Sequence, residues 1–144
     1  MKRINALAGA ALLAASALVT VSAPAQATAA DCASQPWPSP VTNVSTVYTV
    51  DTGFGTAVDL RKGTLNTKQA GWARIRGTTI SGDLVWMDVT KDSGAHWVQC
   101  GPFSVDSSGG IPYTRAYYTS SSASYQFRAC GRAVGGNSIC GPWW

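Results

Sequence analysis

The only histidine of the chain, His96, lies in the stretch TKDSGAHWVQC that spans residues 90–100. Asp92 precedes it by four residues and Ser93 lies between them, so a carboxylate, a hydroxyl and an imidazole occur close together, as nucleophilic catalysis requires. The same stretch is polar, contains Gly94 and separates two apolar runs, which is typical of the turn of a β-hairpin. The first interpretation predicts an enzyme, and the second predicts a protein that works by binding.

The other residues that catalysis would need are missing or are expected in other roles, which favours the interpretation of this stretch as a turn. No G-x-S-x-G motif, which would present a nucleophilic serine, occurs in the chain. A zinc site would need the cysteines, and these are expected in disulfides. A glycosidase needs two carboxylates, yet Glu is absent and most Asp residues fall at turns or strand edges, although Asp59 and Asp88 could meet across strands. We therefore expect no catalytic residue, no metal and no cofactor.

Residues 1–27 have the composition of a secretory signal peptide. Two basic residues follow the initial methionine, an alanine-rich apolar run comes next, and small residues precede the expected cleavage site. Cleavage is expected after Ala27, with Ala29 and Ala30 as alternatives. The product is expected to be a secreted, extracellular protein of 117 residues, 28–144, that is not anchored in a membrane.

All four cysteines lie after the expected cleavage site. Oxidising surroundings outside the cell favour two disulfide bonds, and four cysteines allow three pairings. Cys130 and Cys140 enclose a short segment rich in glycine, so we favour a bridge between them, which leaves Cys32 to pair with Cys100. A bridge that closes the longer of these loops is expected to stabilise the fold by roughly 4 kcal/mol.

The charge of the expected mature chain is small. Residues 28–144 contain nine Lys and Arg residues and seven Asp residues, so their net charge is +2. Because the basic residues are scattered along the sequence, we predict no surface that attracts nucleic acid or an anionic membrane. An ordinary solvated surface is expected.

Short runs rich in Val, Thr, Tyr, Phe and Trp alternate with Gly and Ser clusters, and no convincing helical period occurs. Apolar and polar side chains alternate with a period of two in two of these runs, as in half-buried antiparallel strands. The expected fold is a single all-β domain, a small antiparallel β-sandwich, with a small barrel as the alternative. The seven candidate strands are Val44–Val50, Thr56–Leu60, Gly71–Arg76, Leu84–Val89, His96–Cys100, Tyr113–Thr119 and Ser124–Cys130.

Before the first strand, residues 28–43 form an extended, proline-rich N-terminal arm, and residues 44–144 form the expected sandwich domain. The arm contains PWPSP, whose prolines exclude a regular helix or an inner strand. Trp37 of the arm either docks on its own domain or inserts into a partner. Trp143 and Trp144 end the chain, and neighbours in a strand point to opposite faces, so at least one of them is a candidate contact residue. All three tryptophans are predicted to bind a partner.

Thr90, Asp92, Gly94 and Trp97 have a spacing that resembles the Asp-box, a turn motif of sialidases and other secreted β proteins, although His96 replaces the usual threonine. In the enzymes that carry the motif it is structural and lies away from the catalytic centre. Physically, the short carboxylate accepts backbone N–H bonds and the glycine adopts positive φ. The resemblance implies a structural turn that its tryptophan packs onto the sheet.

Two pairs of motifs resemble small secreted actinobacterial domains of unknown function. V-D-L-R at residues 58–61 and W-A-R-I at residues 72–75 are similar to one such family, but Asp59 replaces a glutamate and a cysteine between the motifs is missing. The family's disulfide pattern therefore does not transfer. R-A-C-G at residues 128–131 and C-G-P-W at residues 140–143 look like the tail of many secreted actinobacterial β domains, which supports the Cys130–Cys140 pairing.

The expected architecture is also similar to the adaptor subunit of secreted umbrella toxin particles, in which a small disulfide-bonded β domain links a lectin-bearing subunit to a toxin polypeptide. We therefore expect a non-enzymatic protein-interaction module, such as an adaptor within an extracellular antibacterial toxin complex, with other secreted proteins as partners. One alternative is a carbohydrate-binding module that uses exposed aromatic side chains. The other is a secreted hydrolase inhibitor that inserts the loop Gly131–Ile139 into an enzyme.

Overall fold

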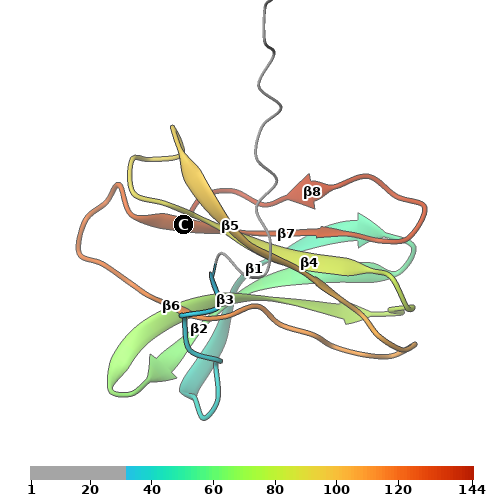
Figure 1. Cartoon of the computed structure of the whole chain (residues 1–144), viewed down its shortest axis with the longest axis horizontal. Helices are drawn as coiled ribbons and strands as arrows, with labels where there is room; N and C mark the ends of the chain where they lie inside the picture. Colours follow the sequence, from blue (N-terminus) through green and yellow to red (C-terminus); the bar gives the residue numbers. More distant parts are fainter. Residues whose placement is uncertain (1–31) are drawn as a thin grey trace, which may run out of the picture.

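The computed structural model describes residues 32–144, which form two antiparallel β-sheets packed face to face (Figure 1). The first sheet has the strand order β1-β2-β3-β6, and the second sheet has the order β5-β4-β7-β8. Within these residues no helix has the length and apolar character needed to cross a membrane. The strands are β1 (Thr42–Gly53), β2 (Thr56–Leu65), β3 (Lys68–Gly77), β4 (Leu84–Thr90), β5 (Trp97–Ser104), β6 (Tyr117–Tyr118), β7 (Gln126–Arg132) and β8 (Ile139–Cys140).

Alternation of side chains along the strands builds the core between the two sheets. Val58 and Leu60 point inward from β2, and Met87 points inward from β4, and all three are fully buried. The residues next to them, Asp59 and Asp88, therefore point to the two opposite outer faces. The core cluster consists of Val58, Leu60, Ala73, Ile75, Val85, Met87, Val89, Val105, Phe127 and Ala129.

A tight turn sets the register between β2 and β3. Asn66 and Thr67 occupy the turn with φ angles of 48° and 66°. Positive φ at both central residues is the type I′ geometry, whose twist suits a two-residue hairpin. Because of this turn, Asp59 of β2 lies directly opposite Arg74 of β3.

Tyr48 of β1 closes one side of the sandwich. Its hydroxyl donates a hydrogen bond of 2.8 Å to the carbonyl oxygen of Pro142 and accepts one of 3.0 Å from the backbone N–H of Ala129 in β7. Beyond β8 the chain continues along β7, where Trp144 and Phe127 exchange backbone hydrogen bonds of 2.8 and 2.9 Å. The C-terminal segment is thereby fixed at this edge of the second sheet.

The proline-rich arm crosses the opposite side of the sandwich, between β5 and the segment that leads into β6; we call this the open side. A disulfide joins Cys32 of the arm to Cys100 of β5. The carbonyl oxygen of Pro36 accepts a hydrogen bond of 2.9 Å from the backbone N–H of Ala116. The arm therefore connects the edges of the two sheets and fills the middle of the gap between them.

The expected all-β fold, its two antiparallel sheets and its two disulfide bonds are confirmed. The bridges are Cys32–Cys100 and Cys130–Cys140, the pairing favoured from the sequence. Each of the seven predicted strands overlaps an observed strand, but the segment Tyr113–Thr119 contributes only two residues to β6. The predicted signal peptide and residues 28–31 of the predicted arm lie outside the described residues.

The eighth strand, β8, was not predicted. It has only two residues, and its register with β7 places Cys140 opposite Cys130. The segment before it is rich in glycine and has no apolar alternation, so the sequence carries no strand pattern there. The disulfide and the neighbouring strand, which are tertiary features, determine its conformation.

Candidate functional site

The turn between β4 and β5 is held by hydrogen bonds between its own side chains and backbone. The hydroxyl of Thr90 accepts a bond of 2.9 Å from the backbone N–H of Gly94 and donates one of 2.8 Å to Oδ1 of Asp92. The same Oδ1 accepts a bond of 2.8 Å from the backbone N–H of His96. Ser93 and Gly94 adopt positive φ angles of 59° and 90°. The polar side chains of this stretch therefore fix the path of the backbone.

The side chains of Asp92 and His96 also form a hydrogen bond. Oδ2 of Asp92 lies 2.7 Å from Nδ1 of His96. The backbone N–H of His96, its imidazole and the hydroxyl of Thr90, in decreasing order, lower the pKa of Asp92 to about 2. The side chain of His96 is 90% exposed, and its ring bonds to no other group within residues 32–144. This arrangement orders the turn and brings no nucleophile to the imidazole.

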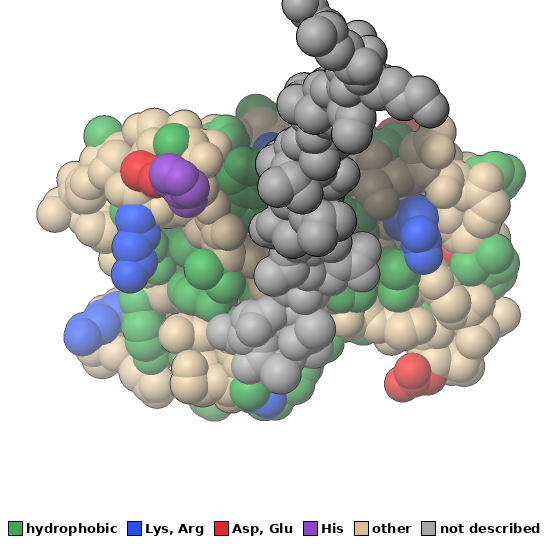
Figure 2. Space-filling model, turned by 45° about the horizontal axis from the view of Figure 1, so that its top comes forward, with side chains coloured by type: hydrophobic (Ala, Val, Ile, Leu, Met, Phe, Trp, Pro, Cys, Tyr) green, Lys and Arg blue, Asp and Glu red, His purple; other side chains and the backbone are tan. Residues whose placement is uncertain are grey.

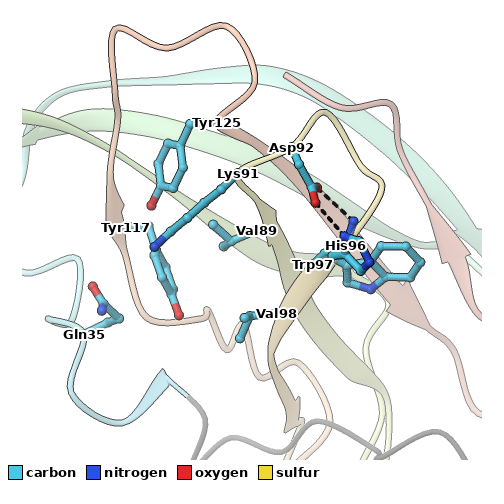
Figure 3. A pocket seen from close by; sticks show the side chains of 9 residues that line it. All are labelled: Gln35, Val89, Lys91, Asp92, His96, Trp97, Val98, Tyr117 and Tyr125. Atoms are coloured by element: carbon cyan, nitrogen blue, oxygen red, sulfur yellow. Dashed lines mark hydrogen bonds and ion pairs between the residues drawn. The ribbon is translucent and has the colours of Figure 1, made fainter.

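A cavity of about 450 Å³ adjoins the turn on the open side of the sandwich. The side chain of Lys91 extends across it toward Tyr117 and Tyr125, and Val89 and Val98 lie on the strands beside it (Figure 3). Figure 2 shows the His side chain next to an Asp side chain at one end of this face, with hydrophobic side chains gathered in the hollow beside them. The cavity combines aromatic and aliphatic walls with one ammonium group.

On the outer face of the second sheet, Arg128 of β7 lies between two tryptophans. Its guanidinium carbon is 4.8 Å from the ring centroid of Trp97 and 4.4 Å from that of Trp143. Its Nε donates a hydrogen bond of 2.8 Å to Oδ2 of Asp88. A guanidinium group stacked on indole faces is stabilised by the ring quadrupole. Trp97 of the predicted turn thus packs on Arg128 and remains 49% exposed.

The two terminal tryptophans point to opposite faces of the second sheet. Trp143 joins the Arg128 stack on the outer face, whereas the ring of Trp144 lies 6.1 Å from that of the core residue Phe127. Both tryptophans are half-buried against the chain's own residues. Their role in partner binding stays a prediction.

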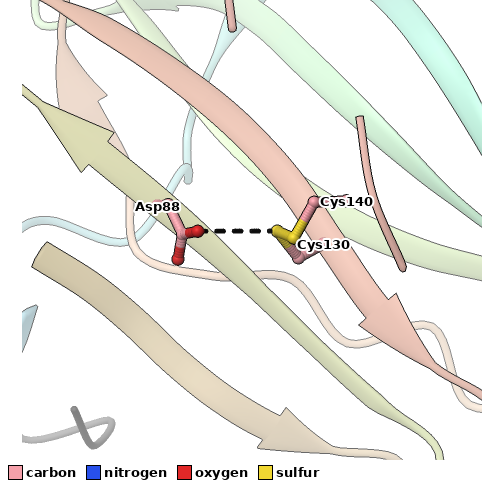
Figure 4. Close-up of side chains that lie close together, drawn as sticks. All are labelled: Asp88, Cys130 and Cys140. Atoms are coloured by element: carbon pink, nitrogen blue, oxygen red, sulfur yellow. Dashed lines mark hydrogen bonds between the residues drawn. A yellow bond between two sulfur atoms is a disulfide. The ribbon is translucent and has the colours of Figure 1, made fainter. Parts of the chain in front are cut away.

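Asp88 lies beside the Cys130–Cys140 disulfide (Figure 4). Its Oδ2 is 3.7 Å from Sγ of Cys130, but a disulfide sulfur carries no hydrogen, so the two atoms are in contact without a hydrogen bond. Oxidised sulfurs also provide no thiolate, so these three residues do not form a metal site. Burial raises the pKa of Asp88 and the neighbouring Arg128 opposes that shift. The role of Asp88 is to hold Arg128.

Sequence reasoning missed an ion-pair cluster on the outer face of the first sheet. Arg74 Nη2 and Arg76 Nε both donate to Oδ2 of Asp59, at 2.6 and 2.9 Å, and the hydroxyl of Thr49 donates to its Oδ1 at 2.7 Å. Burial alone raises the pKa of Asp59, but these hydrogen bonds outweigh it and hold the pKa below its usual value. Asp59 and Asp88, considered as a possible catalytic pair, lie on opposite faces and do not meet.

At the other end of the open side, Trp37 forms one wall of an aromatic groove of about 780 Å³. Its ring centroid lies 5.8 Å from that of Phe103 and 5.9 Å from that of Tyr113. The guanidinium carbon of Arg115 lies 3.8 Å from the same ring centroid. Trp37 thus docks on its own domain, yet 42% of its surface stays exposed. The groove is lined by Trp37, Ser39, Pro102, Phe103, Ser104, Asp106, Pro112 and Tyr113.

No family model, no curated protein and no solved structure matches the chain. Three surfaces within residues 32–144 are candidates for binding another molecule: the cavity beside Lys91, the stack around Arg128 and the groove beside Trp37. The groove is larger than the cavity and is walled mainly by aromatic and proline rings, which suits it to hold an apolar group of another molecule.

Proposed function

We propose that this chain is a secreted, non-enzymatic protein-interaction module. The groove beside Trp37 carries the proposal, because it offers exposed aromatic surface whose position is already fixed. Arg115 stacks on the Trp37 ring, and the Cys32–Cys100 disulfide anchors the arm that carries it. Preorganised aromatic and arginine anchors supply much of the binding energy of protein interfaces. The two disulfide bonds are consistent with an extracellular location.

The specific form of the proposal is an adaptor that links subunits of an extracellular antibacterial toxin complex. An adaptor needs two contact surfaces, and the described residues offer a second one on the outer face of the second sheet. There Trp97 is 49% exposed and is held by Arg128 beside Trp143. The resemblance of the architecture to umbrella-particle adaptors supports the same assignment.

Affinity capture from the culture fluid of the producing organism, followed by mass spectrometry, tests the proposal. We expect large secreted proteins in fixed ratio with the tagged chain, and we expect Trp37→Ala to abolish the capture. Phe54→Ala is the matched control, because Phe54 is 70% exposed but lies in the turn between β1 and β2, away from the groove. A lone monomer in the eluate, or equal loss with both variants, would refute a docking site at Trp37.

Carbohydrate binding is a second candidate, supported by the cavity beside Lys91. Tyr117 and Tyr125 line it together with the ammonium group of Lys91, a combination that can stack on a sugar ring and donate hydrogen bonds to its hydroxyl groups. This function predicts retention on immobilised glycans that Tyr125→Ala abolishes and Trp37→Ala preserves. The opposite pattern would assign the binding to the groove.

A further inference from the structure

The groove beside Trp37 continues a cleft that a proline-rich segment of the chain itself already occupies. The walls of this cleft are β5 and the segment that leads into β6. Residues 35–38, which read QPWP, lie between these walls, and Pro36 accepts a backbone hydrogen bond of 2.9 Å from Ala116. Pro38 is buried, and beyond it the same two walls enclose the groove, through Pro102 and Phe103 on one side and Pro112 on the other.

We propose that the groove binds an extended, proline-containing segment of a partner polypeptide, with a basic residue of that segment facing Asp106. The inference rests on the proposed function, because it specifies the chemistry of the partner that docks beside Trp37. The arm provides the precedent within this molecule, since it shows that a proline-rich strand of chain fits between these walls.

The arrangement of the rings favours proline side chains. Trp37 meets Phe103 at an interplanar angle of 62° and Tyr113 at 83°, so the three rings form two corners that share the Trp37 ring. The centroids of Phe103 and Tyr113 are at most about 12 Å apart, the sum of their distances to the Trp37 centroid, so the two corners, each midway between two rings, lie at most about 6 Å apart. A polyproline II helix rises about 3.1 Å per residue, so prolines one or two positions apart are separated by about 3 to 6 Å along its axis. Two prolines of one extended segment can therefore occupy the two corners.

The polar groups of the groove fit the backbone and charge of such a segment. The indole N–H of Trp37 donates no hydrogen bond within residues 32–144, so it is available to a peptide carbonyl group. Polyproline segments leave their carbonyl groups free for this kind of contact, and aromatic grooves recognise them in this way. Among the residues that line the groove, Asp106 is the one with a charged side chain near neutral pH, so it favours Arg or Lys in the ligand.

A sugar ring is a weaker fit for the same groove. Sugar rings stack on a flat aromatic face and need several hydrogen bonds to their hydroxyl groups. Here the rings stand edge to face, and the polar side-chain groups of the lining are those of Ser39, Ser104 and Asp106 with the hydroxyl of Tyr113 and the indole N–H of Trp37, which lie at the ring edges. The observations therefore favour the peptide, and sugar binding becomes an outcome of the test.

The test uses the full mature protein labelled with nitrogen-15 and two synthetic probes, a proline-rich peptide with one central arginine and the same peptide with glutamate in that position. NMR titration should shift the indole signal of Trp37 and the amide signals of Phe103 and Tyr113. Trp37→Ala should weaken binding at least about tenfold. Tyr113→Ala provides a second variant should the first disturb folding. Asp106→Asn should remove the preference for arginine over glutamate, whereas the control Asp51→Asn should keep it.

Three results would overturn the inference: no shift in the groove with either peptide, shifts confined to another surface, or groove shifts with a soluble chitin or cellulose oligosaccharide but not with the peptides. The proposed function fails separately. If Trp37→Ala abolishes capture from culture fluid while neither peptide binds, the docking site at Trp37 is supported and its specificity for proline is refuted. If the peptides bind but no secreted protein is captured, binding of proline-containing segments by the groove is supported and the adaptor role is refuted.

Discussion

The hydroxyl group of Tyr48 donates a hydrogen bond of 2.8 Å to the carbonyl oxygen of Pro142, 94 positions later in the chain. The same hydroxyl accepts a bond of 3.0 Å from the backbone N–H of Ala129. It therefore bridges a backbone donor of β7 and a backbone acceptor of the segment after β8, between the direct backbone bonds at Gly141 and Trp144. Gly141 makes room for the ring, since a Cβ atom there would lie 2.3 Å from a ring carbon of Tyr48. One side chain of β1 thus completes an edge of the other sheet.

Replacing Tyr48 by Phe should lower the free energy of unfolding by about 1–3 kcal/mol, because a backbone donor and a backbone acceptor both lose their partner. Urea denaturation measures the difference. Tyr118→Phe is the matched control, since it removes a hydroxyl whose hydrogen bond to Asn66 is exposed, and it should change stability by less than about 0.5 kcal/mol. Equal losses in the two variants would show that the bridge adds no stability.

The same tyrosine should make the fold sensitive to alkaline pH. Burial raises the pKa of Tyr48 to about 12. Because the folded pKa lies above the unfolded value of about 10, the neutral hydroxyl contributes stability that is fully present below about pH 10 and is lost as the pH rises toward 12. Urea titrations over this range should show a steeper loss in the unaltered protein than in Tyr48→Phe. Parallel curves would contradict the assignment.

The cluster around Asp59 could have been predicted from the sequence. The motifs V-D-L-R and W-A-R-I-R alternate with a period of two, and a two-residue turn at Asn66 and Thr67 places Asp59 opposite Arg74. These features are local, so alternation and turn chemistry determine which side chains share a face. This hairpin brings Arg74 and Arg76, which are spread along the sequence, together beside Asp59.

The Arg128 stack and the Trp37 groove depend on contacts that no local pattern contains. Alternation in β7 predicts that Arg128 points outward, but its partners Trp97 and Trp143 come from β5 and from the chain end, and only the strand order β5-β4-β7-β8 brings them together. Trp37 was singled out from its sequence, whereas Phe103 was not. The contact between the two rings depends on the path of the arm, which is fixed by a disulfide between residues 68 positions apart.

Replacing Arg128 by Ala should destabilise the fold by about 3–5 kcal/mol, because Asp88 would remain buried without its partner. The side chain of Asp88 is only 2% exposed in the pair. Thermal and urea unfolding of Arg128→Ala, Asp88→Asn and the double variant form a complete cycle. The double variant should be more stable than Arg128→Ala alone, since it removes the unpaired charge. Additive losses would mean that the ion pair contributes no coupling.

The carboxyl group of Asp92 should remain ionised in unusually acidic solution. Its pKa is lowered to about 2, so the stability that it contributes is present above the unfolded value of about 3.9 and is lost as the pH falls through about 2. The backbone N–H of His96 makes the largest contribution, and it survives in His96→Ala. That variant should therefore fold, and carbon-13 NMR should show a pKa for Asp92 between the unaltered and the ordinary values. A fully ordinary pKa would assign the effect to the imidazole.

The Cys32–Cys100 disulfide should matter for partner binding as well as for stability. The double substitution Cys32→Ser and Cys100→Ser removes a bridge between residues 68 positions apart, and it should lower the free energy of unfolding by about 4 kcal/mol. It also releases the arm, which can then leave the open side. The indole NMR signal of Trp37 should then move toward its position in an unfolded peptide, and capture of the partner should weaken.

Cys130→Ser with Cys140→Ser is the control for this prediction. It removes a bridge between residues only 10 positions apart and should lower the free energy of unfolding by about 3 kcal/mol. The arm stays attached to β5. The Trp37 signal and the capture should therefore persist in it under conditions where the protein stays folded. Because the two variants lose comparable stability, a difference in capture reports on the position of Trp37. Equal capture by both would show that binding does not need the anchored arm.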